Sequence, residues 1–247
     1  SVGRHMENLV DKGFAHVTRK PPELAYAFSH SITQEVSYDL MLFDQRRKLH
    51  RSIAQWYEAT TKSKSAIVSN YSLLAYHWRL AGDLIQTIGY LEKAGDVANS
   101  TGAYKEAESS YLEAIELAGD KIPGESPSVV KLRRARWRRK LASALFDQGE
   151  LNRCRDAITQ TLTLLGQAPP KTTLGWYFLI FRIRLVTTLR GGNRYGKPRS
   201  RGRRETLIES SFAARKLAEC CYREQEEVPM LGASWLAVRL GEKAGGY

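Results

Sequence analysis

Helical periodicity from Ser31 to the end of the 247-residue chain limits the fold more than any other feature of the sequence. Apolar and small residues recur there at three- and four-residue spacing, which places them on one face of an α-helix. Glycine, proline and aspartate interrupt the pattern at the points where helices would end. The sequence therefore predicts a mainly α fold. The expected helices are 31–43, 44–61, 66–81, 84–100, 104–118, 128–148, 151–165, 172–190, 204–224 and 228–243.

A repeated pattern of small and aromatic residues runs through the middle of these helices. In its best copy, one glycine lies inside a helix, a second lies at the following turn, and the next helix carries an alanine–aromatic–alanine series. This order fits the tetratricopeptide pattern, and such helix pairs are expected to stack into a degenerate superhelix with a concave surface. The best copy is Gly95, Gly102, Tyr104, Ala107, Tyr111 and Ala114; weaker copies are Ala75, Gly82, Leu91 and Ala94, and Ala142, Gly149, Cys154 and Ile158.

Residues 1–30 differ from the rest, because they are predicted to form a helix and two strands. The helix should end at Gly13, the residue type expected just past a helix C-terminus. Segments 15–19 and 24–28 can then pair across a Lys-Pro-Pro turn. A helix followed by a two-stranded wing is the end of a winged-helix subdomain, so we expect the chain to begin inside one. The expected parts are this winged-helix end (1–30), junction helices (31–61) and a tetratricopeptide-like α-solenoid (62–247).

The junction between these parts should be a packed cluster. Ser31 can cap the first helix through its hydroxyl, and Gln34 completes a capping-box pattern. Apolar side chains on both sides of this cap should join the wing to the first repeat. Two histidines lie among them without a catalytic carboxylate or nucleophile, so we interpret them as packing residues. The expected cluster is Phe28, His30, Ile32, Val36, Tyr38, Leu49, His50 and Ile53.

Segment 28–58, FSHSITQEVSYDLMLFDQRRKLHRSIAQWYE, resembles the region that follows the nucleotide-binding module in a class of multidomain signalling proteins. Those proteins carry an ATPase of the signal-transduction type and a helical-repeat tail, often behind class III adenylyl or guanylyl cyclase domains. LAYHWRLAG at 74–82 and AARKLAECCYREQEEVPMLGASWLAVRLG at 213–241 continue the resemblance more loosely. The resemblance implies that the chain closes a winged-helix subdomain and opens the repeat array of such a protein.

No pattern in the sequence predicts catalysis, a metal or a cofactor. The chain has no G-x-x-x-x-G-K-[ST] loop for binding phosphates and lacks the metal-binding aspartates of a cyclase. His30, His50 and His77 are separated by 20 and 27 residues, unlike a metal-binding pair on one helix. We therefore expect this chain to be no enzyme and to hold no cofactor.

Two smaller clusters are also interpreted as structural. Cys220 and Cys221 are neighbours on a helix and point about 100° apart, so they are expected to be buried small residues without a redox role. Glu224, Glu226 and Glu227 lie at the end of that helix, where a solvated turn is expected.

Basic residues outnumber acidic ones by 38 to 26, and the resulting formal charge of +12 favours acidic partners. Seven lie in KLRRARWRRK at 131–140, which we interpret as a solvated helix face. Seven more lie in 190–204, and 191–203 is expected to be a flexible loop. Contact with an acidic domain, RNA or lipid headgroups is the alternative, and only weak, non-specific polyanion binding is expected. The residues that would make this contact are Arg190, Arg194, Lys197, Arg199, Arg201, Arg203 and Arg204.

The most apolar run is LGWYFLIFRIRLVTTL at 174–189. It is 16 residues long and includes Arg182 and Arg184, whereas a membrane-spanning helix needs about 20 apolar residues. We predict a buried or half-buried helix of the repeat array, with a membrane-surface helix as the alternative. The three cysteines form no disulfide framework, which favours a reducing compartment such as the cytoplasm.

These features predict a non-catalytic regulatory or scaffolding arm of a signalling ATPase, with coupling to a nucleotide cyclase implied by the resemblance. Its partners would be other domains of the parent protein, or a protein or peptide in the concave groove. Two alternatives stay open: the repeat region of an ATPase-linked transcriptional regulator, and a stand-alone adaptor that binds peptides.

Overall fold

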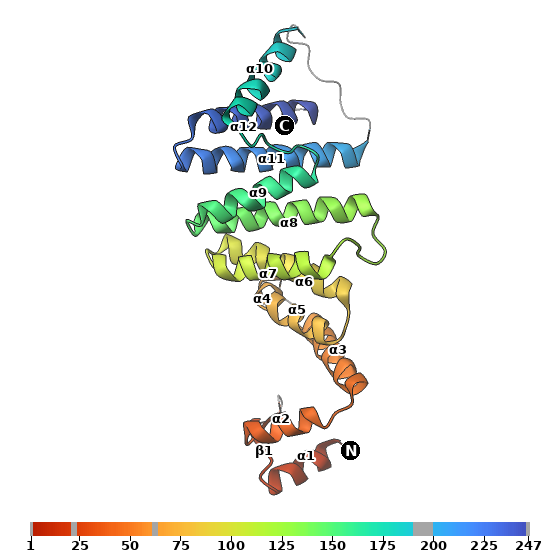
Figure 1. Ribbon diagram of the computed structural model, residues 1–247. Coiled ribbons are helices and arrows are strands. Elements are labelled where there is room, and N and C mark those ends of the chain that lie inside the picture. Colours follow the sequence, from red (N-terminus) through yellow and green to blue (C-terminus); the bar gives the residue numbers. More distant parts are fainter. Residues whose placement is uncertain (1, 21–23, 61–63, 190–199, 246–247) are drawn as a thin grey trace.

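The protein is mainly α, as predicted (Figure 1). The computed structural model describes residues 2–20, 24–60, 64–189 and 200–245. These residues form twelve helices and two strands. The strands are β1 (Ala15–Arg19) and β2 (Ala25–Phe28), and the helices are α1 (Val2–Asp11), α2 (Ser31–Asp39), α3 (Phe43–Thr60), α4 (Lys64–Ser69), α5 (Tyr71–Leu80), α6 (Leu84–Ser100), α7 (Tyr104–Ala118), α8 (Pro127–Asp147), α9 (Leu151–Leu164), α10 (Thr173–Leu189), α11 (Arg201–Arg223) and α12 (Glu227–Lys243).

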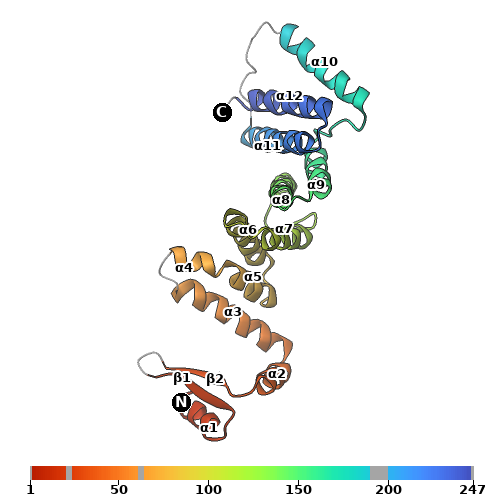
Figure 2. The same ribbon diagram turned by 90° about the vertical axis from the view of Figure 1, so that its left-hand side faces the viewer.

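From α3 onward the helices stack along one axis, so the molecule is long rather than globular (Figures 1 and 2). Neighbours in the chain are mostly neighbours in space: α5 packs on α3 and α6, α7 on α6 and α8, and α9 on α8 and α11. α10 departs from this order, because it packs on α12 across the far side of the α11–α12 pair. The principal contacts of each helix pair are therefore with the pairs next to it.

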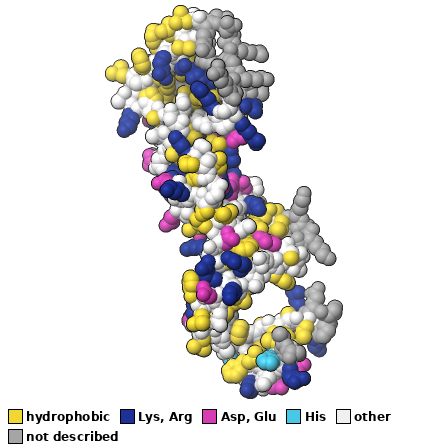
Figure 3. Space-filling view, turned by 90° about the vertical axis from the view of Figure 1, so that its right-hand side faces the viewer, with side chains coloured by type: hydrophobic (Ala, Val, Ile, Leu, Met, Phe, Trp, Pro, Cys, Tyr) yellow, Lys and Arg dark blue, Asp and Glu magenta, His cyan; other side chains and the backbone are white. Residues whose placement is uncertain are grey.

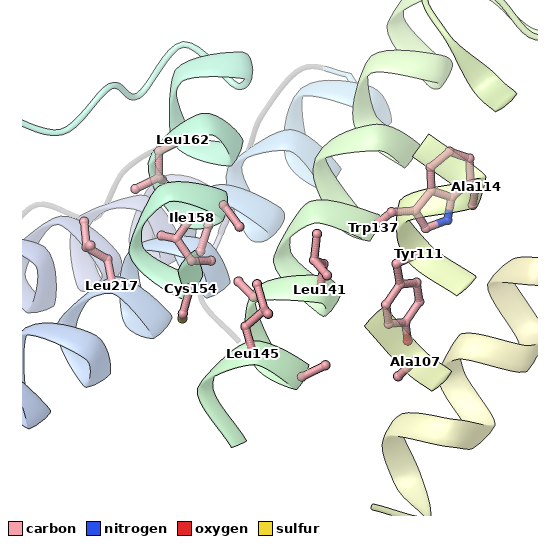
Figure 4. Close-up of a cluster of buried hydrophobic side chains, with 14 of the residues drawn as sticks. Ala107, Tyr111, Ala114, Trp137, Leu141, Leu145, Cys154, Ile158, Leu162 and Leu217 are labelled. Carbon is pink, nitrogen blue, oxygen red and sulfur yellow. The ribbon is translucent and has the colours of Figure 1, made fainter. Parts of the chain in front are cut away.

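The apolar core runs as a continuous band through this stack. Figure 4 shows a stretch of it, in which Tyr111 of α7, Leu145 of α8 and Ile158 of α9 belong to one cluster. Small side chains such as Ala107 and Ala114 are completely buried there and let the helices approach. Packing of small and large residues across neighbouring helices thus holds the stack together.

The two strands form where the sequence predicts them. β1 and β2 pair antiparallel, with Ala15 opposite Phe28 and Val17 opposite Tyr26. α1 packs on β1. The expected turn between the strands falls partly on residues 21–23, which lie outside the described residues.

The ends or caps of several helices differ from the prediction; α2, expected to run to residue 43, ends at Asp39. The helix expected over 66–81 is two helices, α4 and α5, separated at Asn70, where φ is −101° and ψ is 2°. Ser31 does not cap α2: it is the first helical residue, and His30 occupies the cap position without a side-chain hydrogen bond. α11 begins at Arg201, because the hydroxyl of Ser200 accepts a hydrogen bond from the backbone amide of Arg203 at 3.3 Å. Residues 201–203 are therefore helical and are not part of a loop.

At several turns between consecutive helices, one residue adopts the left-handed backbone conformation, with positive φ. Gly82, Gly102 and Gly149 fill this position with φ of 73°, 81° and 84°. Glycine suits it because it has no β-carbon to clash with the backbone. Between α11 and α12 the same position is taken by Gln225, with φ of 59°.

Candidate interaction groove

The basic residues of segment 131–140 on α8 form ion pairs with acidic residues of the neighbouring helices. Arg133 bonds to Glu92 of α6, with 3.2 Å between Nη2 and Oε2. Arg139 pairs with Glu209 of α11, a residue that is only 4% exposed. The interpretation of 131–140 as a solvated face is therefore wrong, because acidic residues of the neighbouring helices lie level with these arginines.

The expected polyanion contacts are only partly described. Arg201 pairs with Glu205 one turn later at 2.9 Å, and Arg204 donates from Nε to the carbonyl of Ala244 at 3.2 Å. Arg203 is exposed. Arg190, Arg194, Lys197 and Arg199 lie outside the described residues, so polyanion binding by this segment stays a prediction.

The junction is a short hydrogen-bonded series in place of the expected apolar cluster. The Tyr38 hydroxyl lies 2.9 Å from Nε2 of His50, and Nδ1 of His50 lies 2.9 Å from Nδ1 of His77. These contacts join α2, α3 and α5. Burial lowers the pKa of both histidines, and for His77 the nearby His50 lowers it further. The series therefore holds best when both rings are neutral.

The other residues expected at the junction do not join this series. Ile32 is 71% exposed, and α2 has no buried side chain among those described. The apolar side chains of α2 face solvent, because its links to α3 are polar: besides the Tyr38–His50 contact, Arg46 donates to the backbone carbonyls of Asp39 and Met41. Ile53 is half-buried, and the exposed members of the expected cluster are Phe28, His30, Ile32, Val36 and Leu49.

The residues of the repeat pattern lie at the contacts between helices. The ring of Tyr111 is 1% exposed, and its hydroxyl donates to Asp96 at 2.7 Å. Lys140 of α8 donates to the same oxygen at 2.6 Å, which links α6, α7 and α8. Tyr104 is half-buried, Gly82 and Gly102 are at turns, and the buried members are Ala75, Leu91, Ala94, Gly95, Ala107, Tyr111 and Ala114.

Sequence reasoning missed two contacts that depend on distant residues. Cys220 faces Cys154 of α9, with 2.9 Å between the sulfur atoms, and all three cysteines are buried. The turn before α12 is held by Arg155, which bonds to Glu226 at 2.6 Å and also contacts Glu224. The turn is thus not simply solvated. No local signal in the sequence reveals either pairing, because the partners are 66 to 71 residues apart.

An apolar groove follows the outer surface of the α11–α12 pair. One half has a volume of about 490 Å³ and lies between Phe212 and Val238. The other half, of about 500 Å³, continues toward Tyr222 and Met230. The two halves form one groove, because both are lined by Arg215, Ala218 and Ser234.

Cationic side chains border this groove at one end. The ring of Phe146 from α8 closes that end, with Lys216 Nζ 4.5 Å and the Arg223 guanidinium 5.5 Å from the ring centre. Arg215 lies in the middle of the groove and pairs with Glu219 at 3.2 Å. The groove thus has an apolar floor with both basic and acidic side chains along it, among them Glu219 and Glu242, which suits an apolar peptide segment with polar groups at its edge.

The described residues contain no grouping of three or more histidine, cysteine, aspartate or glutamate side chains that could hold a metal ion. In the same part of the chain, no helix has both the length and the apolar character required to cross a bilayer.

Comparison with known proteins identifies a distant relative of part of the chain. No protein-family model matches the chain. An uncharacterized protein of Rhizobium meliloti (strain 1021) is 28% identical over 127 residues, which is 51% of this chain and 12% of that protein. The matched part of the chain thus spans only about an eighth of the length of this relative.

Proposed function

We propose that the chain is a non-catalytic regulatory or scaffolding arm of a multidomain signalling ATPase, coupled to a nucleotide cyclase. In this proposal its helix pairs are tetratricopeptide-like repeats, and the groove on α11 and α12 binds a protein or peptide segment. That open apolar groove is the observation that carries the proposal. Apolar grooves with a few placed polar groups are common binding sites for segments of other proteins.

Two further observations support this function. The core contact between Gly95 and Tyr111 is of the kind that the tetratricopeptide pattern requires. The relative from Rhizobium meliloti is much longer than the matched region, as expected for a repeat arm within a multidomain protein. Signalling, ATP hydrolysis and cyclase coupling are expectations that come from the sequence resemblance.

The groove can be tested by filling it. Ser234 is exposed and lines both halves, so Ser234→Trp places an indole in the groove without entering the core. In the parent protein, this variant should change ATP turnover or its response to other domains. The matched control is Ser52→Trp, at an exposed serine on α3 away from the groove. Equal turnover in wild type and both variants would remove the groove from the proposal.

The absence of chemistry in the chain itself is tested separately. The purified chain should neither hydrolyse ATP nor form a cyclic nucleotide. Turnover that follows the protein through successive purification steps would overturn the non-catalytic assignment.

A further inference from the structure

One face of α10 is anchored on the last helix pair. Trp176, Leu179 and Ile183 are buried, and they face α12. The indole of Trp176 rests on the backbone of Gly232, where a β-carbon would clash with the ring. These contacts fix the rotation of α10 about its own axis. They therefore determine which of its side chains point away from α12.

That other face is an exposed apolar strip, which we call the α10 strip. Figure 3 shows hydrophobic side chains at the end of the molecule where α10 lies. At 100° per residue, the members of the strip fall within an arc of about 120°, and Thr188 is the single polar residue inside that arc. The α10 strip consists of Leu174 (81% exposed), Tyr177 (56%), Phe178 (67%), Phe181 (62%), Leu185 (45%) and Leu189 (77%).

Arginines flank the α10 strip on both sides. On the same helical projection, Arg182 and Arg184 each lie about 20° beyond one edge of the arc. Both side chains are exposed, and the Arg184 guanidinium lies 5.8 Å from the ring centre of Trp235 on α12. From Ala157 to Arg204 the sequence contains no aspartate or glutamate. The segment of sequence that contains α10 is thus entirely neutral or cationic.

We propose that the α10 strip lies on an anionic lipid surface. A helix whose apolar face is rich in Phe, Tyr and Leu, with arginines at its edges, matches the boundary between acyl chains and headgroups. The apolar side chains would enter that boundary, and Arg182 and Arg184 would reach the lipid phosphates. The helix lies along the surface and does not span it, which agrees with its length and charge.

The charge pattern favours lipid over a second copy of the chain. Because both edges of the strip carry arginine and no acid lies nearby in the sequence, two copies meeting through this strip would bring arginines together without a counter-charge. A phosphate-rich surface supplies counter-charges along both edges at once.

The test is sedimentation of the chain with phosphatidylcholine vesicles that contain or lack phosphatidylglycerol. Wild type should bind only the anionic vesicles. Phe178→Ser with Phe181→Ser should weaken binding by more than about tenfold, because each ring loses its burial. The matched control is Ile85→Ser with Leu112→Ser, which removes exposed apolar side chains of α6 and α7 and should leave binding unchanged.

A second variant tests the arginines separately. Arg182→Gln with Arg184→Gln should weaken binding about thirtyfold, from about 1 kcal/mol per arginine at an anionic surface. Equal thermal unfolding midpoints would show that these variants are folded. Three results would each overturn the proposal: no binding to anionic vesicles at low salt, binding that is unchanged in the phenylalanine variant, or self-association that depends on the strip in place of vesicle binding.

Discussion

Tyr111 lies so close to Gly95 that a β-carbon at position 95 would be 2.7 Å from the Cε1 atom of its ring. Ordinary contacts of a β-carbon are longer than 3.4 Å, so only glycine fits at this point of α6. The contact brings α6 and α7 close together in the middle of the stack.

Gly95→Ala should destabilise the protein, although alanine favours helix formation by about 1 kcal/mol over glycine. The matched control is Gly89→Ala in the same helix, where no atom lies within 4 Å of the added β-carbon. That change should stabilise the protein by up to about 1 kcal/mol. Chemical unfolding of both variants checks this, and a gain in stability for Gly95→Ala would contradict the contact.

Tyr111 should contribute strongly to the core, because it is 1% exposed. Tyr111→Ala should lower the free energy of unfolding by about 3 kcal/mol through loss of apolar contacts and a residual cavity. Tyr111→Phe removes only the hydrogen bond to Asp96 and should cost about 1 kcal/mol. Thermal and chemical unfolding measure both effects, and an unchanged midpoint for Tyr111→Ala would mean that the ring is not in the core.

Gln225→Gly should stabilise the turn between α11 and α12. The backbone at Gln225 is left-handed, with φ of 59°, and a residue with a β-carbon costs about 1 kcal/mol more than glycine there. The reciprocal change, Gly149→Gln, places glutamine in a turn with φ of 84° and no atom near the added β-carbon. It should destabilise by a similar amount. Changes of the same sign in the two variants would be inconsistent with this account.

Stability should fall in mild acid because of His50 and His77. Their pKa values are lowered in the folded state from an ordinary value of 6.5. As the pH falls through this value, the unfolded chain takes up protons that the folded protein does not, so the free energy of unfolding decreases. The contribution of the two neutral histidines to the free energy of unfolding is fully present above pH 6.5. It is lost progressively as the pH falls below 6.5 and through their lowered pKa values.

A His77 variant isolates this effect. His77→Asn keeps a polar group near Nδ1 of His50 but removes one titrating ring, so unfolding free energies measured from neutral to mildly acidic pH should show a shallower slope. Ser52→Asn, at an exposed serine of α3, removes no titrating group and should keep the wild-type slope. Equal slopes in all three proteins would contradict the role of the histidine pair.

The three thiols should resist alkylation in the folded protein. All three are buried, which keeps the reagent away from the sulfur atoms; in addition, burial raises the pKa of Cys221 to about 11, so this thiol carries almost no reactive thiolate near neutral pH. Iodoacetamide should label all three only after unfolding. A Ser52→Cys variant supplies an exposed thiol as the positive control. Rapid labelling of Cys154, Cys220 or Cys221 without unfolding would be evidence against their burial.

Helices could be predicted from the sequence because their signals are local. Apolar spacing and turn residues located α6, α7, α9 and α12 to within a residue or two. The break at Asn70 could not be foreseen, since asparagine is also tolerated inside helices and the turn there depends on packing. Local patterns therefore define the elements better than their ends.

The partners of each helix face could not be predicted in the same way. Ile32 and Val36 are predicted to pack in the junction because they are apolar, yet both are exposed; periodicity shows only which side chains share a face and not what covers it. The pairing of Arg139 with Glu209, 70 residues apart, depends on how pairs stack. The groove on α11 and α12 likewise exists only once these helices are side by side.

Because contacts are chiefly between adjacent helix pairs, the length of the stack is set by how many pairs it contains. Among the residues that the structure describes, no principal contact ties α3 to α12, so a pair could be inserted or removed without rebuilding the remaining core. Each added pair would lengthen the stack by one step and turn its far end by a fixed angle. The spacing and relative orientation of anything held at the two ends would then be set by the number of pairs between them.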